Sequence, residues 1–273
     1  MSNETVLITG CSSGIGRATA AAFLDDEWNV WATARDESDV SDLRQRGAAT
    51  AELDVTKPAQ CRDVVDDVLD TEGRLDCLVN NAGYGQAGAV EDVTTRRVNR
   101  QFDVNLYGPH RLMRAVLPHM REREEGTIIN LSSVAGRVST PGQGVYSASK
   151  FALEAMSDAL RGEVDPYGID VVLVEPGPVD TSFAKRLAAE LEPLESSGAY
   201  DRVYRFFEDF DAVSGGFASN DPEDVAAVVL EAASTTDPSA RYPVGQVAWA
   251  MTLTRYLPDR FRDTVVNFLY GLA

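Results

Sequence analysis

Short apolar runs alternate along this chain with longer segments in which apolar residues recur at helical spacing. The runs predict strands at 5–9, 30–34, 50–54, 75–80, 127–131 and 169–175. The periodic segments predict helices at 14–26, at 222–234 and from Pro58 onward, where the apolar face is Val64, Val65, Val68 and Leu69. Alternating strands and helices predict an α/β fold with a parallel sheet, covered on both faces and joined by right-handed crossovers.

The segment 181–220 breaks this alternation. It is acidic and contains Gly215-Gly216 and the aromatic residues Phe183, Tyr200, Tyr204, Phe206, Phe207 and Phe210. No linker, internal repeat or low-complexity stretch precedes it. We expect a helical excursion from a single domain that spans 1–273, followed by an apolar, aromatic tail over 240–273, rather than a second domain.

Composition excludes several classes of protein. The 273 residues carry a formal net charge of −18, from 43 acidic and 25 basic side chains. A chain this acidic offers no electrostatic footprint for nucleic acid or for an anionic membrane. No apolar run reaches the ~18 residues that a bilayer-spanning helix needs, and we see no signal peptide before the first strand. Cys11, Cys61 and Cys77 lack disulfide or metal-ligand spacing, which fits a reducing cytoplasm.

The composition of the charged residues is biased, with three lysines against 22 arginines and 25 aspartates against 18 glutamates. Such a composition is typical of proteins from salt-saturated cytoplasm, where molar salt shortens the Debye length to about 3 Å and screens carboxylate repulsion. We therefore predict a halophilic source and a melting temperature that rises from dilute buffer to molar KCl. Equal melting temperatures would instead favour an acidic protein of a mesophile with a GC-rich genome.

The first predicted strand ends in a glycine-rich turn, Thr9-Gly10-Cys11-Ser12-Ser13-Gly14-Ile15-Gly16. Glycines between a strand and a helix let the backbone approach a pyrophosphate, whose charge the helix N-terminus stabilises. Tight turns also need glycine, but a position inside a strand–helix–strand unit favours nucleotide binding. The spacing is GxxxGxG, which differs from the GxGxxG of most dinucleotide folds.

Four further motifs follow this turn at fixed spacings. They are Asn80-Asn81-Ala82-Gly83, Val104-Asn105-Leu106-Tyr107-Gly108, Tyr146-Ser147-Ala148-Ser149-Lys150 with Ser133 thirteen residues before its tyrosine, and Pro176-Gly177 with Thr181. Together the motifs resemble those of the short-chain dehydrogenase/reductase family, in order from residue 5 to about 181. The resemblance implies a doubly wound, Rossmann-like domain with a seven-stranded parallel sheet of order 3-2-1-4-5-6-7.

Tyr146 and Lys150 are four residues apart, so a helix presents both side chains on one face. An ammonium near a phenol favours the phenolate, and we expect it to lower the Tyr146 pKa from its usual ~10 toward neutral pH. The alternative is a structural tyrosine beside a solvated lysine. With three lysines in the chain, one retained here indicates a position that arginine does not serve.

Ser133 and Asn105 complete the expected catalytic set, which is Asn105, Ser133, Tyr146 and Lys150. We expect Ser133 to donate a hydrogen bond to a substrate oxygen. The alternative role, a helix cap or turn, is our interpretation of the neighbouring Ser132. A buried asparagine is costly unless it is bonded. The resemblance implies that Asn105 holds a water that links Lys150 to solvent in a proton relay.

The residues after the second strand predict the choice of cofactor. Relatives specific for NAD usually carry an acidic residue at the position of Ala34, where it binds both ribose hydroxyls. Ala34 cannot do so, whereas Arg35 can pair with a 2′-phosphate. Asp36 either holds the ribose or caps the next helix, and capping is the commoner role. We therefore expect NADP(H) to be preferred, with NAD(H) possible.

The resemblance implies the remaining cofactor contacts. Asp54 and Val55 correspond to the segment beside the adenine ring, and 176–181 to the segment at the nicotinamide end. The full expected set is Gly10, Ser12, Ser13, Gly14, Ile15, Gly16, Arg35, Asp54, Val55, Asn81, Ala82, Gly83, Tyr146, Lys150, Pro176, Gly177, Val179 and Thr181.

The remaining motifs give weaker indications of function. His110 and His119 have no carboxylate or cysteine partners at ligand spacing, so we expect packing or surface roles and no metal. Glu122-Arg123-Glu124-Glu125 fits a solvated helix end. In the family, the equivalent of 181–220 is a lid over the substrate. Its aromatic residues, with Trp249, Met251 and Tyr256, predict a fairly apolar substrate.

The sequence thus predicts a cytoplasmic oxidoreductase that transfers a hydride between a nicotinamide and a carbonyl or secondary alcohol. The chain looks most like the branch that includes retinol and 17β-hydroxysteroid dehydrogenases. Helices around 100–120 and 145–165 form subunit contacts in the family, which implies a homodimer or homotetramer. A non-catalytic NAD(P)-binding sensor or scaffold is the alternative, but it would normally lack Tyr146 or Lys150. A methyltransferase has no use for that pair.

Overall fold

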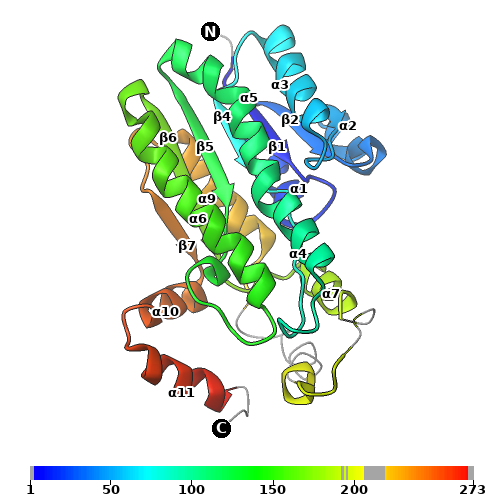
Figure 1. Cartoon of the computed structure of the whole chain (residues 1–273). Coiled ribbons are helices and arrows are strands. Elements are labelled where there is room, and N and C mark those ends of the chain that lie inside the picture. The colour runs from blue at the N-terminus through cyan, green and yellow to red at the C-terminus, as the bar shows by residue number, and fades with distance from the viewer. Residues whose placement is uncertain (1–2, 192–193, 195, 206–218, 270–273) are drawn as a thin grey trace.

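The computed structural model describes residues 3–191, 194, 196–205 and 219–269. The chain forms a seven-stranded sheet of order β3-β2-β1-β4-β5-β6-β7, in which every neighbouring pair is parallel. The predicted doubly wound, Rossmann-like architecture and its strand order are confirmed (Figure 1). The strands are β1 Thr5–Thr9, β2 Asn29–Ala34, β3 Ala49–Glu52, β4 Cys77–Asn80, β5 Gly126–Leu131, β6 Ile169–Pro176 and β7 Arg241–Val244.

The central strands are apolar at consecutive positions because both faces of the sheet are covered. In β1, Val6 and Ile8 pack into one core and Leu7 packs into the other. Ile129 and Ile128 of β5 divide between the same two cores. The side chains alternate with the period of two that a strand imposes, so a continuous apolar run supplies both cores at once.

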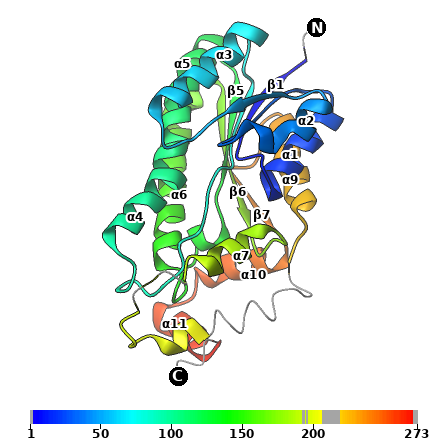
Figure 2. The same ribbon diagram turned by 90° about the vertical axis from the view of Figure 1, so that its right-hand side faces the viewer.

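Helices cover the two faces separately (Figure 2). On one face α1 Gly14–Asp25 packs with α9 Pro222–Ser234, and on the other lie α3 Pro58–Glu72, α5 Gly108–Arg123 and α6 Gly144–Val164. The shorter elements are η1 Glu37–Val40, α2 Ser41–Gln45, α4 Thr95–Phe102, the π-helix η2 Asp103–Tyr107, η3 Val134–Gly136, η4 Asp165–Tyr167, α7 Ser182–Ala189, α10 Gln246–Thr254 and α11 Asp259–Leu269. Of these, α7, α10 and α11 lie beyond the carboxyl ends of the strands, where open α/β sheets bind ligands (Figure 1).

The boundaries of the elements differ from the prediction by one or two residues. The third strand ends at Glu52 rather than 54, because the Asp54 side chain accepts hydrogen bonds from the backbone and hydroxyl of Thr56 and turns the chain. The fourth strand begins at Cys77 rather than 75. Helix α3 begins at Pro58 as predicted, and its buried face includes Val64, Val65 and Val68.

The segment 181–220 opens with helix α7, and Tyr200 and Tyr204 are half-buried. Phe206, Phe207, Phe210 and Gly215-Gly216 lie outside the described residues. The tail consists of β7, α10 and α11. Within the described part of the chain, no helix has the length and apolar character needed to cross a membrane.

The three cysteines are buried free thiols. Burial raises the pKa of Cys11 to about 12 and that of Cys61 to about 11, and it raises the pKa of Cys77 further. Thiols held in the protonated form inside a core act as small apolar packing groups.

Candidate active site

The glycine turn between β1 and α1 brings backbone N–H groups to the carboxyl edge of the sheet. Gly10 and Gly14 adopt left-handed φ angles of 75° and 57°. Ser13 is the N-cap of α1, but its side chain makes no cap hydrogen bond, and the first turn contains no acidic residue. Ser12 is half-buried in the turn, and Ile15 packs against the core below it. The N-terminus of α1 is therefore open to an anion.

Gly16 permits the tightest approach in this turn. A Cβ there would overlap Asn81 Nδ2 and the carbonyl oxygen of Gly10. The Asn81 amide donates to the carbonyl oxygens of Thr9 and Gly10, at 2.8 and 3.1 Å. The turn is thus fastened to the chain that follows β4, which brings two motifs that are far apart in the sequence into one structure.

Thr9 also holds the chain after β4 against the glycine turn, a role that the sequence did not predict. Its hydroxyl accepts hydrogen bonds from the backbone N–H groups of Asn81 and Ala82, at 3.0 and 2.9 Å. Gly83 follows, and a Cβ there would lie 3.3 Å from Asn105 Oδ1. A threonine inside an apolar strand gives no sign of such a role, because threonine is a common strand residue.

Helix α7 lies against the glycine turn. A Cβ on Gly14 would lie 3.2 Å from Thr181 Cγ2, and the Thr181 hydroxyl accepts from the Phe183 N–H at 3.1 Å at the start of α7. Arg186, also on α7, donates to Ser13 Oγ at 3.5 Å. A cation therefore stands beside the N-terminus of α1. Arg186 was not predicted, because 173 residues separate it from Ser13.

The expected nicotinamide segment leads from β6 to α7. Pro176 ends β6, and the Gly177 N–H donates to the Val244 carbonyl oxygen at 3.1 Å. A Cβ on Gly177 would lie 3.3 Å from the backbone nitrogen of Ala248 in α10. Val179 pairs with Asn220 in an isolated bridge. The segment thus lies between α10 and the glycine turn.

Helix α6 places Tyr146 and Lys150 on one face, as predicted. Both are buried, and Lys150 Nζ lies 5.9 Å from the centroid of the Tyr146 ring. The ammonium donates to the carbonyl oxygen of Leu131 at 2.6 Å. Leu131 ends β5, immediately before the Ser132-Ser133 pair. The tyrosine, the lysine and the serine segment therefore meet at one place.

The predicted lowering of the Tyr146 pKa is wrong. Burial raises the pKa of Tyr146 to about 12, and the Ser133 hydroxyl beside it opposes the shift only in part. Burial also lowers the pKa of Lys150 to about 8, with the charge of Glu154 opposing. Desolvation is the largest cause of both pKa shifts, because each charged form loses its hydration in the interior. The Tyr146 phenol therefore keeps its proton at neutral pH.

Ser133, rather than Ser132, is the helix cap, which corrects the prediction for this pair. The Ser133 hydroxyl oxygen accepts from the Ala135 N–H at 3.1 Å and caps η3. The Ser132 hydroxyl is buried and has no partner among the described residues. A hydroxyl that accepts one hydrogen bond still has its own proton to donate. The cap therefore fixes the position of the Ser133 oxygen and leaves the donor available.

Asn105 lies in the π-helix η2 and is buried. Its Nδ2 donates to the Tyr84 carbonyl oxygen at 2.9 Å and to Ser149 Oγ at 3.2 Å, and its Oδ1 accepts from the Tyr84 N–H at 3.2 Å. Protein groups thus use both amide hydrogens. A water held by this residue would bind the backbone carbonyl or the second lone pair of Oδ1, so the side chain chiefly ties the chain after β4 to α6.

The residues expected around the adenine and its ribose differ in what they contact. Arg35 is exposed at the end of β2. Asp36 caps η1, accepting from the N–H and hydroxyl of Ser38 at 2.9 and 2.6 Å, which agrees with the capping alternative. Asp54 is occupied by Thr56 in the turn described above. Val55 is buried, and a Cβ on Gly108 would lie 2.8 Å from its Cγ2.

An ionic cluster forms around two buried carboxylates. We call it the Arg137 cluster, and it consists of Arg137, Glu154, Glu175 and Arg241. Arg137 Nη1 lies 3.1 Å from Glu175 Oε1 and 3.8 Å from Glu154 Oε2. Arg241 Nε lies 3.2 and 3.1 Å from the same two oxygens. Burial and the neighbouring Glu154 raise the pKa of the fully buried Glu175 to about 7. The cluster joins the chain after η3 to α6, β6 and β7.

The histidines take the packing and surface roles that were expected. His119 is half-buried on α5, and its Nε2 accepts from the Leu75 N–H at 3.3 Å. His110 is exposed on the same helix. The acidic run at Glu122 lies at the exposed end of α5. Among the residues that the structure describes, no three histidine, cysteine or acidic side chains are grouped as a metal site requires.

Comparisons with known proteins agree with this architecture. The sequence model of the short chain dehydrogenase family matches residues 4–192. The oxidoreductase YbbO of Escherichia coli is 37% identical over 97% of this chain and 94% of its own. A 3-ketodihydrosphingosine reductase of Bacteroides thetaiotaomicron is 34% identical over the full length of both chains. Human retinol dehydrogenase 8 is 36% identical over 87% of this chain and 80% of its own.

Solved structures give the same picture. A short-chain dehydrogenase from Streptomyces avermitilis superposes with a TM-score of 0.83 at 35% identity, over 98% of this chain and 96% of that one. A short-chain dehydrogenase/reductase from Burkholderia phymatum, solved in complex with NAD, has a TM-score of 0.79 at 27% identity, over 95% of each chain. Relatives of this fold therefore bind a nicotinamide dinucleotide.

Proposed function

The chain belongs to the short-chain dehydrogenase family of oxidoreductases, and on that premise we propose that it uses NADP(H) to interconvert an apolar carbonyl compound and its secondary alcohol. The observation that carries the proposal is the meeting of three features at the carboxyl edge of the sheet. These are the buried Tyr146–Lys150 pair, the Ser133 hydroxyl that caps η3, and the open N-terminus of α1.

The residues of the glycine turn fit a dinucleotide. Because Gly10 and Gly16 have no side chains, the backbone of the turn packs tightly against the residues after β4 and leaves the N-terminus of α1 accessible. Arg186 adds a positive charge beside Ser13. We propose that this turn binds the pyrophosphate and that the segment 176–181 and Lys150 bind the nicotinamide end. A bound nicotinamide supplies the hydride donor or acceptor.

The protein's own residues then handle the oxygen of the substrate. In reduction, the carbonyl carbon gains the hydride, and Tyr146 Oη transfers its proton to the carbonyl oxygen, while Ser133 donates a hydrogen bond to the same oxygen. In oxidation the proton returns to Tyr146. Lys150 stabilises the phenolate that forms after reduction, until a proton from solvent restores the phenol. Because the Tyr146 pKa is raised to about 12, reduction starts from the protonation state that prevails at neutral pH.

We propose that 181–220 covers the substrate and that the covered space is apolar. Phe183 of α7 lies 5.7 Å from the Tyr146 ring, centroid to centroid, at an interplanar angle of 54°. A Cβ on Gly85 would lie 2.9 Å from Phe183 Cζ and 2.6 Å from Leu187 Cδ1, so α7 closes on the chain after β4. Relatives named for 3-ketodihydrosphingosine and retinol support a hydrocarbon-rich substrate.

Cofactor choice is tested at Arg35. We expect kcat/KM to be higher with NADPH than with NADH, and Arg35→Ala to lower it about 10- to 100-fold for NADPH alone, because a charge-assisted hydrogen bond contributes about 1.5–3 kcal/mol. Arg46→Ala is the matched control, because Arg46 is also exposed but pairs with Asp25. A wild-type preference for NADH would refute the role given to Arg35.

Catalysis itself is tested with a panel of ketones and aldehydes and their alcohols. Oxidation of NADPH by an apolar member of the panel supports the proposal. Quenching of NADPH fluorescence without turnover of any member would favour a non-catalytic sensor. We also propose a homodimer or homotetramer, as the family resemblance implies, and light scattering measures its size. The three free cysteines favour the cytoplasm as its location.

A further inference from the structure

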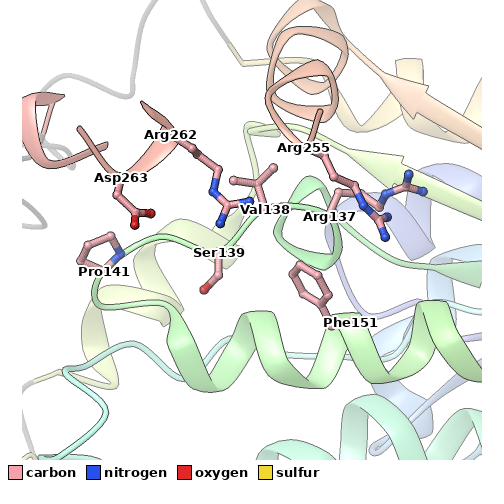
Figure 3. Close-up of a pocket in the computed structure, with 8 residues that line it drawn as sticks. All are labelled: Arg137, Val138, Ser139, Pro141, Phe151, Arg255, Arg262 and Asp263. Carbon is pink, nitrogen blue, oxygen red and sulfur yellow. The ribbon is translucent and has the colours of Figure 1, made fainter. Parts of the chain in front are cut away.

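A cavity of about 490 Å³ lies between α6, the loop after η3 and the two helices of the tail (Figure 3). We call it the arginine cavity. Phe151 of α6 and the loop residues Val138 and Pro141 give it an apolar wall. Arg255 at the end of α10 and Arg262 on α11 reach into it from the tail. Its volume and its mixture of apolar and charged side chains are those of a small-molecule site.

The arginine cavity is separate from the candidate active site. The four candidate catalytic side chains are not among the described residues that line it. Tyr146 and Phe151 are five residues apart on α6, so at 3.6 residues per turn their side chains point about 140° apart around the helix axis. The cavity still borders both catalytic segments, because Phe151 directly follows Lys150 and Arg137 directly follows η3.

The three guanidinium groups that line the cavity are only partly engaged by the protein. Arg255 forms no hydrogen bond or ion pair with any described residue, and Arg262 Nη2 lies 3.0 Å from Asp259 Oδ1 at the exposed start of α11. Arg137 contacts the carboxylates of the Arg137 cluster through Nη1, whereas its buried Nε has no partner in the described part of the chain. Each guanidinium carries several N–H donors, so donors remain for an acceptor inside the cavity.

One carboxylate, that of Asp263, also lines the cavity (Figure 3). It pairs with none of the three lining arginines, all of which the structure describes. The arginines therefore are not neutralised from within the cavity, and arginine does not lose its charge by deprotonation. The chain as a whole carries −18 and repels anions, so this concentration of positive charge is a local exception.

We propose that the arginine cavity is a second ligand site, which binds a small organic anion with a flat, apolar body. The carboxylate or phosphate of the ligand accepts charge-assisted hydrogen bonds from Arg255 and Arg262. The hydrocarbon part packs against Phe151 and removes the apolar wall from water. An inorganic ion would fill little of the cavity and would leave that wall wet. The ligand is distinct from the substrate, because the cavity and Tyr146 lie on different sides of α6.

Calorimetric titration with four probes tests the chemistry of the site, at a KCl concentration at which circular dichroism shows the protein folded. We expect benzoate and phenyl phosphate to bind, since each combines an anionic group with a ring. Inorganic phosphate should bind at least about tenfold more weakly than phenyl phosphate, because it lacks the buried apolar area. Benzyl alcohol has the ring without the charge and should show no binding.

Substitutions in the cavity test its location. Arg255→Gln and Arg262→Gln should each weaken binding of phenyl phosphate about 10- to 100-fold, through loss of a charge-assisted hydrogen bond. Asp263→Asn should strengthen it by up to about fivefold, because a repelling exposed charge is removed. Phe151→Ala should weaken the binding of phenyl phosphate but not that of inorganic phosphate. Arg260→Gln is the matched control, since Arg260 is an exposed arginine of α11 that does not line the cavity.

Four results would overturn the proposal. Neither aromatic anion binds the wild type, or both bind Arg255→Gln and Arg262→Gln as tightly as the wild type. Loss of binding in Arg186→Gln would place the probes at the glycine turn, beside which Arg186 lies. Competitive inhibition of ketone reduction by phenyl phosphate would place the probe in the substrate site. The calorimetric measurements need no turnover, so they remain decisive if the proposed reaction is wrong.

Discussion

Replacing Tyr146 by phenylalanine is expected to lower kcat about 10²- to 10⁴-fold in both directions, which is the usual contribution of a positioned general acid or base. The substitution removes only the hydroxyl. The ring still packs against Phe183 and stays buried, so α6 and the surrounding core should keep their structure. Cofactor affinity, measured by NADPH fluorescence, should be unchanged, because the proposed pyrophosphate site lies in the glycine turn.

Tyr84→Phe is the matched control for this substitution. Tyr84 is half-buried and close to Asn105, but its hydroxyl has no hydrogen-bond partner among the described residues. Loss of that hydroxyl should leave kcat near the wild-type value. A Tyr146→Phe protein that keeps more than about a tenth of wild-type turnover would assign the proton donor to another group, because it would fall short of the general-acid range.

The parts of the fold that the sequence predicted are those with local causes. A buried parallel strand reads as a short apolar run, and a helix reads as apolar residues at a period of 3.6, so strand order followed once the family was identified. Pro58 at the start of α3 is a local signal of the same kind. Boundaries were less accurate, because turns such as that at Asp54 depend on single side-chain hydrogen bonds.

The parts of the candidate site that were missed depend on contacts between distant residues. Arg186 reaches Ser13, and Thr9 binds the chain after β4, only because the fold brings them together. The direction of the Tyr146 pKa was wrong because the four-residue spacing to Lys150 reveals their proximity but not their burial. Desolvation of a phenol cannot be read from a motif.

The Arg137 cluster is the clearest example of such contacts between distant residues, and replacing Arg137 should destabilise the protein strongly. Arg137→Met is expected to lower the free energy of unfolding by about 3–5 kcal/mol, because it leaves a buried carboxylate without one of its two cationic partners. Glu175 is fully buried, and the Arg137 side chain is 10% exposed. Chemical denaturation measures the effect. Arg46→Met, which breaks the exposed pair with Asp25 and a long, exposed hydrogen bond to the Ala21 carbonyl oxygen, should cost less than about 1 kcal/mol.

The loss of stability caused by Arg137→Met should grow as pH rises. Glu175 has its pKa raised from 4.5 to about 7 in the folded protein, so the folded state binds more protons than the unfolded state between those values. The contribution of this group to stability therefore falls as pH rises through that window. Arg137 lowers the Glu175 pKa, so its loss extends the window upward. Arg137→Met should consequently destabilise the protein more at pH 8 than at pH 5.

Removing the charge of Glu175 should reverse most of this loss. In the double variant Arg137→Met/Glu175→Gln the buried carboxylate is gone, so stability at pH 8 should return toward the wild-type value and the added pH dependence should disappear. If the double variant is as unstable at pH 8 as Arg137→Met, Arg137 stabilises the protein by packing rather than by charge. The cluster also lies close to the candidate catalytic residues, because Arg137 follows the Ser133 cap and Glu154 follows Lys150 by one helical turn. Measuring kcat of Arg137→Met at pH 8 therefore tests whether the cluster also positions these residues.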